Sequence, residues 1–332
     1  MNKKTTLKDV ARHAGVSVAT VSHVVNHTYN VSSTTRKLVL SSVEALNYRP
    51  DVMARSLKIG RCNLIAFVVP DIANAFFATL IEEVEQIVAE KGYRLLIMNT
   101  KETLARETGV LHALSRSIVD GLLLASTSTA YEQIQDVIPP NMPMVFLDRY
   151  AEDSRCDSVI IENYTAMYQG VAHLISLGHK KIGYISGLNG LSTTSERLNA
   201  YKAAMDAHGL YRNNLIREGT SMLHCAPAHV NSLLHEEKCT ALVISNNVMT
   251  TEAMVQMLNA GIRPGKDVEI LGYRDSDQPQ YGLQHIHLIA QPTTLLGRAA
   301  GQQMLYRLSH PDAPVRQTVL QATFYPKGQF PL

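Results

Sequence analysis

The feature that most constrains the fold is a regular alternation of short apolar runs with longer helical patterns, beginning near residue 63. Continuous apolar runs of this length predict strands of a parallel sheet that is covered on both faces. The runs form two successive groups, at residues 64–69, 93–98, 121–125, 144–147 and 159–161, then at 182–185, 241–244 and 268–271. We therefore predict two doubly wound α/β lobes, with ligand crevices at the carboxyl ends of their strands.

The first 48 residues carry a different pattern, typical of three short helices. Thr6 and Asp9 have the spacing of a capping box that starts a helix, and Gly15 permits the turn that ends it. Ser17 is a good N-cap for a second helix, and Ser32 or Ser33 can cap a third. Apolar residues recur at helical spacing and predict one small core, formed by Leu7, Val10, Ala11, Ala14, Val21, Val24, Val25, Val39, Val43 and Leu46.

Two helices joined by a tight glycine turn, with a third in support, form a helix-turn-helix. In this motif the second helix enters the major groove of DNA, where Val18 and Ala19 can contact thymine methyl groups and His23 can read bases. The candidate DNA-binding residues of the head are Thr6, Ser17, Val18, Ala19, Thr20, Ser22, His23 and Asn26. A plain three-helix bundle would show the same helices, so the helices alone leave both interpretations open.

Charge is divided unevenly between the head and the rest of the chain. Residues 1–61 contain ten Lys and Arg against three Asp and Glu, whereas the remaining residues contain 21 against 26. A basic head on an acidic body indicates a polyanion-binding module attached to a second domain of another function.

Several spaced segments of the head resemble the lactose-repressor/galactose-repressor (LacI/GalR) family, namely residues 6–11, 14–17, 20–26, 31–36 and 46–50. The resemblance implies that residues 51–58 are a hinge helix that folds on the operator, with Arg55, Leu57 and Lys58 at the DNA. An eight-residue helix is marginal in water, so DNA would supply the missing stabilisation. Leu57 would wedge into the minor groove. Asp51 stands where the family usually has Asn, which places a negative charge near phosphate.

The resemblance extends over nearly all of the chain and implies three parts. These are a helix-turn-helix domain at 1–48, a hinge at 49–61, and an effector-binding and dimerisation core at 62–332 whose fold resembles periplasmic sugar-binding proteins. The first lobe would comprise residues 62–161 and 292–324 and carry much of a homodimer interface, and the second lobe would comprise 162–291. The chain would cross between the lobes three times, with a strand at 318–324 returning to the first lobe.

The family resemblance also implies an effector site between the lobes, formed by Asn74, Phe76, Asp148, Arg197, Asn246, Arg274 and Gln291. Arg197 matches a cleft arginine that binds ligand hydroxyls or carbonyls. Arg274 stands where an aspartate commonly accepts from sugar hydroxyls, which suggests that Arg197 and Arg274 together favour an anionic sugar derivative. A neutral sugar remains the alternative, with Arg274 paired to Asp275 or Asp277 and pointing away.

Other functions find little support in the sequence. The four cysteines form no C-x-x-C pair, the histidines match no strong zinc spacing, and no P-loop, G-x-S-x-G or H-E-x-x-H motif is present. We therefore expect no enzyme activity, no metal, no cofactor and no membrane partner, and a cytoplasmic location. The predicted function is a transcription regulator, most simply a repressor, that binds a palindromic double-stranded operator as a homodimer under control of a small molecule. The alternatives are a ligand-insensitive regulator, an activator, and a sugar-binding transport receptor.

Overall fold

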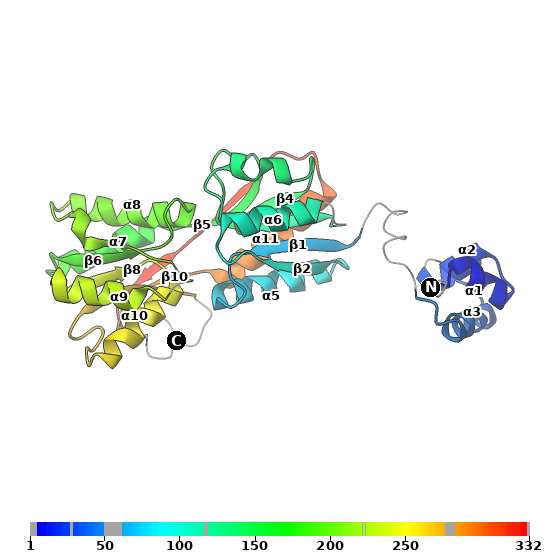
Figure 1. The fold of residues 1–332 in the computed structure, drawn as a ribbon, viewed down its shortest axis with the longest axis horizontal. Coiled ribbons are helices and arrows are strands. Elements are labelled where there is room, and N and C mark those ends of the chain that lie inside the picture. The colour runs from blue at the N-terminus through cyan, green and yellow to red at the C-terminus, as the bar shows by residue number, and fades with distance from the viewer. Residues whose placement is uncertain are drawn as a thin grey trace. The chain divides into compact units, whose positions relative to one another are not determined.

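The computed structural model describes residues 5–26, 29–49, 62–115, 119–220, 222, 224–275 and 283–330. Contacts divide the chain into two compact units, Met1–Cys62 and Asn63–Leu332. They are the helical head and the α/β core of Figure 1.

The head has three helices as predicted: α1 (Leu7–Ala14), α2 (Val18–Asn26) and α3 (Ser33–Ala45). Gly15 ends α1 with φ 65°, a left-handed conformation that glycine adopts without steric cost. Val10, Val21 and Val39, one from each helix, are completely buried against one another. The His13 Nδ1 atom lies 3.0 Å from the Ser42 hydroxyl and adds a polar link between α1 and α3.

The first sheet of the core has six strands in the order β11-β5-β4-β3-β1-β2, and all neighbouring pairs are parallel. Its strands are β1 (Leu64–Val69), β2 (Arg94–Asn99), β3 (Gly121–Leu124), β4 (Met144–Asp148), β5 (Asp157–Glu162) and β11 (Gln317–Gln321). The helices on it are α5 (Ala75–Ala89), α6 (Leu104–Ser115) and α11 (Thr293–Ser309). α5 and α11 cover one face of the sheet, and α6 covers the other (Figure 1).

The second sheet has the order β12-β10-β9-β8-β6-β7 and is parallel except at β12. Its strands are β6 (Ile182–Ser186), β7 (Ile216–Glu218), β8 (Ala241–Ile244), β9 (Glu269–Asp275), β10 (His287–Gln291) and β12 (Thr323–Tyr325). One face carries α7 (Tyr164–Ser176) and α8 (Ser192–Asp206), and the other carries α9 (Ala226–Asn231) and α10 (Asn247–Asn259). Short helical turns occur at Tyr131–Gln133, Gln135–Val137, Asn213–Leu215 and Ser232–Glu236.

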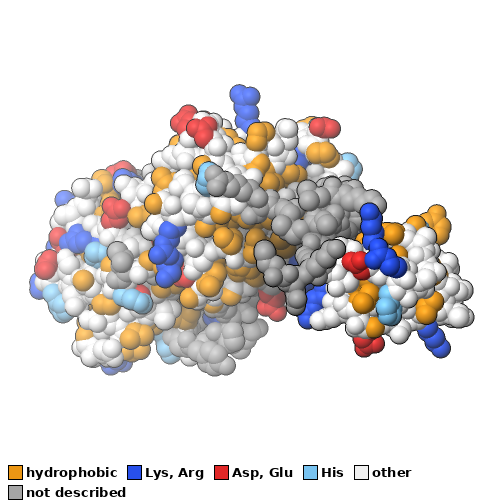
Figure 2. All heavy atoms as spheres, turned by 45° about the vertical axis from the view of Figure 1, so that its right-hand side comes forward, with side chains coloured by type: hydrophobic (Ala, Val, Ile, Leu, Met, Phe, Trp, Pro, Cys, Tyr) orange, Lys and Arg blue, Asp and Glu red, His pale blue; other side chains and the backbone are white. Residues whose placement is uncertain are grey.

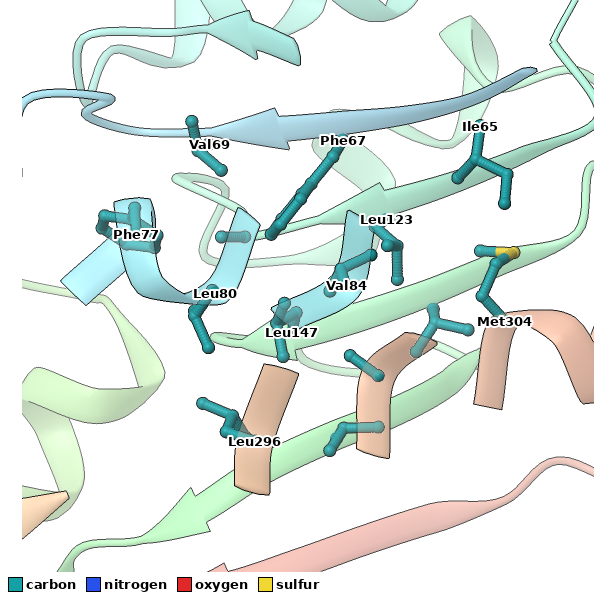
Figure 3. Close-up of a cluster of buried hydrophobic side chains, with 14 of the residues drawn as sticks. Ile65, Phe67, Val69, Phe77, Leu80, Val84, Leu123, Leu147, Leu296 and Met304 are labelled. Carbon is teal, nitrogen blue, oxygen red and sulfur yellow. The ribbon is translucent and has the colours of Figure 1, made fainter. Parts of the chain in front are cut away.

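The core of the first lobe explains why its apolar runs are strands. Phe67, Leu123 and Leu147 point from neighbouring parallel strands toward α5 and α11, where Leu80 and Met304 meet them (Figure 3). All five side chains are fully buried. Burial of each such side chain stabilises the fold by about 2 kcal/mol. The remaining residues of these strands face α6, so both faces of the sheet must be apolar.

The chain passes between the two sheets three times, after β5, after β10 and after β11. The single strand expected at 318–324 is instead two strands: β11 pairs with β5, and β12 pairs antiparallel with β10. Placing residues 323–324 in the first lobe was therefore wrong. Phe324 belongs to the second lobe because it packs beside Gly170 of α7, where the absence of a side chain leaves room.

Candidate DNA-binding surface and effector cleft

The candidate DNA-binding surface is built on two capped helix N-termini of the head. The Thr6 hydroxyl accepts from the Asp9 N–H at 3.4 Å, and the Asp9 carboxylate accepts from the Thr6 N–H at 3.0 Å. The Ser17 hydroxyl accepts from the Thr20 N–H at 3.0 Å. These caps set the direction in which α1 and α2 begin.

The first turn of α2 exposes side chains that the sequence predicts to meet DNA. Ser17, Val18 and Ala19 are exposed, and Val18 keeps 41% of its surface accessible. Val21 and Val24, by contrast, are buried on the inner face of the same helix. Val18 is thus a large aliphatic group left on the surface, which suits contact with thymine methyl groups.

His23 lies beside an aromatic residue that sequence reasoning missed. The rings of His23 and Tyr29 meet edge to face, with centroids 5.0 Å apart, and Tyr29 is 72% exposed. Thr20, Ser22 and His23 itself are half-buried. Tyr29 carried no signal because it lies outside the helical periodicity of α2.

Of the four remaining predicted DNA contacts, the structure describes the backbone position of one. Asn26 is the last residue of α2. Arg55, Leu57 and Lys58 lie outside the described residues, as does the predicted hinge helix around them. Figure 2 shows basic side chains projecting from the visible face of the head.

The candidate effector cleft lies where the carboxyl ends of the two parallel sheets meet. Arg197 of α8 is 7% exposed and donates to Ser245 O at 2.7 Å. It also donates to Asn163 Oδ1 and to Gln291 Oε1, each at 2.9 Å. Its guanidinium carbon stands 4.1 Å from the centre of the Tyr273 ring. Four neutral groups therefore hold Arg197, and Gln291 acts as one of its supports.

Asp148 and Arg149 follow one another at the end of β4 and carry unused hydrogen-bonding capacity. Asp148 has φ 65° and is 6% exposed, and burial raises its pKa although the charges of Arg149 and Arg197 oppose this. Within the described residues its buried Oδ1 atom has no hydrogen-bond partner, and neither have Nε and Nη1 of Arg149. A free acceptor and free donors thus lie on adjacent residues.

Polar contacts between described residues join the lobes across the cleft, and two of them involve predicted or neighbouring site residues. Glu102 of the first lobe accepts from Arg149 Nη2 at 2.9 Å and from the Thr220 hydroxyl of the second lobe at 2.7 Å. Asn247 of the second lobe donates to Asn74 of the first at 2.9 Å. Asn74 also caps α5, because its Oδ1 atom accepts from the N–H of the second residue of that helix.

The structure places Asp275, which sequence reasoning missed, beside these residues. Its carboxylate accepts from Asn247 at 3.3 Å and from the Thr293 hydroxyl at 3.4 Å. Burial raises the pKa of Asp275 to about 6, and the charge of Asp148 adds to the shift. Asp275 is the last residue of β9, whereas the sequence predicts the preceding Arg274 as the residue at the site.

Arg274 lies apart from Arg197. Successive side chains of a strand point to opposite faces, so Arg274 and the Tyr273 ring that holds Arg197 lie on different sides of β9. The Arg274 guanidinium carbon stands 4.8 Å from the Phe330 ring, and its Nε atom donates to Asp275 O at 3.2 Å. The structure thus does not bring together the two cations that suggested an anionic effector.

Phe76 and Asn246 have structural roles at the edge of the cleft. Phe76 is 4% exposed and belongs to the apolar core of the first lobe. Asn246 caps α10, since its side chain accepts from the Met249 N–H at 2.8 Å. Asn246 also lines a small cavity between the lobes.

That cavity measures about 30 Å³ and is lined by Glu102, Arg149, Gly187, Leu188, Leu191, Thr193, Thr194, Arg197, Ser245 and Asn246. A space of this size accepts a water molecule, whereas pockets for small organic ligands typically measure about 300–1,000 Å³. This cavity is therefore too small for such a ligand, which can reach Arg197 and Asn246 only if the lobes separate or side chains move. A larger pocket of about 570 Å³ lies between the lobes beside Asn74 and Asn247.

Metal sites and membrane-spanning helices are both absent from the part of the chain that the structure describes. No group of three or more His, Cys, Asp and Glu side chains there could hold a metal ion. Likewise, none of the described helices combines the length and apolar character that crossing a membrane requires.

A helix-turn-helix head and a two-lobed core with a polar interlobe cleft define the class of DNA-binding regulators that sense a small molecule. Residues 6–51 match the family described as bacterial regulatory proteins, lacI family. Residues 63–327 match the periplasmic binding proteins and sugar binding domain of the LacI family. The chain belongs to the LacI family and is a DNA-binding transcriptional regulator.

Individual relatives agree with this assignment. The chain is 34% identical to the HTH-type transcriptional repressor PurR of Photobacterium profundum over 307 residues, 91% of this chain and 92% of that protein. The PurR repressor of Aliivibrio salmonicida is 33% identical over 329 residues, 95% of this chain and 98% of its own.

Solved structures show the same architecture. A putative ribose operon repressor from Burkholderia thailandensis matches with a TM-score of 0.70 and 30% identity, over 80% of this chain and 99% of that one. The transcriptional regulator CelR in complex with cellobiose matches with a TM-score of 0.72 and 25% identity, over 98% of this chain and 100% of that one. The Lac repressor dimer bound to its operator matches with a TM-score of 0.81 over 99% of this chain and 100% of that one. Its sequence identity is 24%, so this match supports the fold alone.

Proposed function

We propose that this regulator is a repressor that binds a palindromic operator as a homodimer and releases or tightens it in response to an uncharged, hydroxyl-bearing effector. The observation that carries the effector class is the unused hydrogen-bonding capacity at the end of β4. Asp148 offers a buried acceptor next to the buried donors of Arg149. A hydroxyl group both donates and accepts, so the hydroxyl groups of a sugar suit both residues.

The rest of the cleft supports an uncharged effector over an anionic one. The acids Glu102, Asp148 and Asp275 outnumber the cations Arg149 and Arg197 in this region. Arg274, the third cation that favoured a phosphate or a sugar acid, lies on the other face of β9. The solved relative that carries cellobiose shows that this family fold accepts an uncharged sugar.

For homodimerisation, the open edge of the first sheet supports a second copy. β2 is the last strand of that sheet, so its outer hydrogen-bonding side has no neighbouring strand in the order described. A groove of about 590 Å³ runs along it, lined by residues of α5, of β2 and of the turn between them, which include Ile81, Tyr93, Leu95 and Ile97. The groove also contains the charged Glu85 and Arg94, and exposed apolar groups rimmed by polar ones mark interaction surfaces. Sedimentation of the full chain with operator should give two chains per palindrome.

The experiment that tests the function begins with DNA selected from random sequence by the full-length protein. Its affinity is then measured in neutral mono- and disaccharides, sugar phosphates and nucleosides, at one fixed salt concentration because phosphate contacts make affinity salt-dependent. A palindrome whose affinity changes at least tenfold with a neutral sugar is the expected result. Selection of no common sequence would refute the repressor, and a response confined to sugar phosphates would refute the uncharged effector.

We further propose that the chain has no enzyme activity and acts in the cytoplasm at the nucleoid. The named relatives are repressors, and bacterial DNA lies in that compartment. Recovery of the effector unchanged after prolonged incubation with the protein tests the first point. Imaging of a fluorescent fusion together with stained DNA tests the second.

A further inference from the structure

Glu102 stands in an unusual backbone turn after β2. Lys101 and Glu102 have φ values of 50° and 53°, in the left-handed region that residues with a side chain seldom adopt. The turn is held because the Glu102 N–H donates to Pro70 O at 3.2 Å and the Lys101 N–H donates to the Asn99 side chain at 3.1 Å. Two consecutive strained residues persist only where the surrounding structure fixes them. Their effect is to send the Glu102 side chain into the cleft, where it is 9% exposed.

The two carboxylate oxygens of Glu102 go to different lobes. Oε1 accepts from Arg149 in its own lobe, and Oε2 accepts from the Thr220 hydroxyl in the loop after β7 of the other. Among the described residues of that loop, the Thr220 N–H donates to Cys225 Sγ at 3.3 Å and the Met222 N–H donates to the Thr220 hydroxyl at 3.2 Å. Glu102 therefore contacts a fixed partner on each side of the cleft.

The charges around Arg149 determine which ligands this part of the cleft can bind. Arg149 faces the Glu102 carboxylate at 2.9 Å and the Asp148 carboxylate at 3.7 Å, and all three residues belong to the first lobe. The guanidinium is thus already paired with the Glu102 carboxylate before any ligand binds, and a second acidic side chain lies beside it. A phosphate or carboxylate placed beside them would add repulsion in a site that is shielded from water, where screening is weak.

We propose that Glu102 is an internal anion that occupies the position of an acidic ligand group between Arg149 and Thr220. It lets the lobes close on an uncharged effector and excludes phosphates and carboxylates from the cleft. Glu102 is therefore a specificity-determining residue that acts partly by repulsion, as selective sites commonly do. This inference rests on the proposed effector cleft and names the residue that sets its ligand charge.

The test compares inorganic phosphate binding by the full-length wild type and Glu102→Gln. The amide keeps the size of the side chain and can still accept from Thr220, but it removes the negative charge that pairs with Arg149 at 2.9 Å. Thermal unfolding of the core is followed during phosphate titration, with potassium chloride holding the ionic strength constant. We expect Glu102→Gln to show a saturable stabilisation with a midpoint at least tenfold below any seen for the wild type.

Three control variants make the result specific. Glu102→Ala also frees Arg149 and should gain the same phosphate response. The double variant Glu102→Gln with Arg149→Gln should lose it, because the cation is gone. Thr220→Val removes the hydrogen bond across the cleft but keeps the Glu102–Arg149 pair, so it should respond to phosphate as the wild type does and show faster hydrogen exchange in its loop.

Equal phosphate responses of the wild type and both Glu102 variants would overturn the inference. So would a phosphate response in Thr220→Val equal to that of Glu102→Gln, because closure rather than charge would then exclude the anion. Operator affinity is measured for every variant to show that the head is folded. Failure of the charge test leaves operator binding untouched, whereas failure to bind any operator refutes the proposed function and leaves the phosphate comparison interpretable.

Discussion

Replacement of Asp275 by asparagine should stabilise this protein at neutral pH. Asp275 is 1% exposed, and burial together with the nearby Asp148 charge raises its pKa to about 6 from an ordinary 3.8. Because the folded state holds this proton more tightly than the unfolded chain, stability is greatest at low pH and falls as pH rises from about 4 to above 6. The full difference corresponds to about 3 kcal/mol, an upper value for the gain expected from Asp275→Asn.

The stability gain from Asp275→Asn should depend on pH, and this dependence tests the prediction. Asparagine resembles the protonated carboxyl, so the gain should approach about 3 kcal/mol at pH 7.5 and shrink to about 1 kcal/mol at pH 4.5. Urea unfolding of the full chain, followed by circular dichroism through the transition of the core, measures both values. A gain that is the same at the two pH values, or a loss at pH 7.5, would refute the reasoning.

A matched control is available on the protein surface. Asp267 is bonded to Arg263, which lowers the pKa of Asp267 to about 2, so its charge is favourable in the folded state. Asp267→Asn should therefore give no stabilisation at pH 7.5. If both variants stabilise the protein equally, a general effect of net charge explains the result and the burial of Asp275 does not.

The remaining predictions concern the head, the cleft and the core. His23→Ala should relax base preference at one half-site position in a selection experiment; equal loss on selected and random DNA would count against its role as a reader. Lys37 is an exposed cation of α3 that we predict to contact phosphate, so Lys37→Ala should weaken selected and random DNA alike and reduce the salt slope by about 1. Arg197→Lys should abolish the effector response while operator affinity stays within twofold, because a lysine cannot reproduce the three directed hydrogen bonds; an unchanged effector midpoint would contradict this. Phe67→Ala should lower the unfolding free energy by about 3–5 kcal/mol in urea titrations, and a loss below 1 kcal/mol would show that the first-lobe core can collapse around the gap.

Local signals in the sequence determined the helical head. The Thr6–Asp9 capping box and the left-handed Gly15 each act within a few residues, so their effect does not depend on the rest of the fold. The apolar runs likewise determined which segments of the core become strands, because a strand buried on both faces must be apolar throughout. The family and the class of function followed from these patterns.

Only the tertiary structure decided which polar residues face one another in the cleft. Glu102 and Thr220 are 118 residues apart in the chain, and Asn74 and Asn247 are 173 apart. Such pairs depend on how two sheets meet, and no local pattern encodes that meeting. The face of β9 that borders the cleft is likewise decided by the packing of the sheet. Because side chains alternate along a strand, Arg274 points away from the cleft and Asp275 lies beside it. The sequence therefore predicted that an effector site exists, and the packing of the two lobes determined which charged side chains line it.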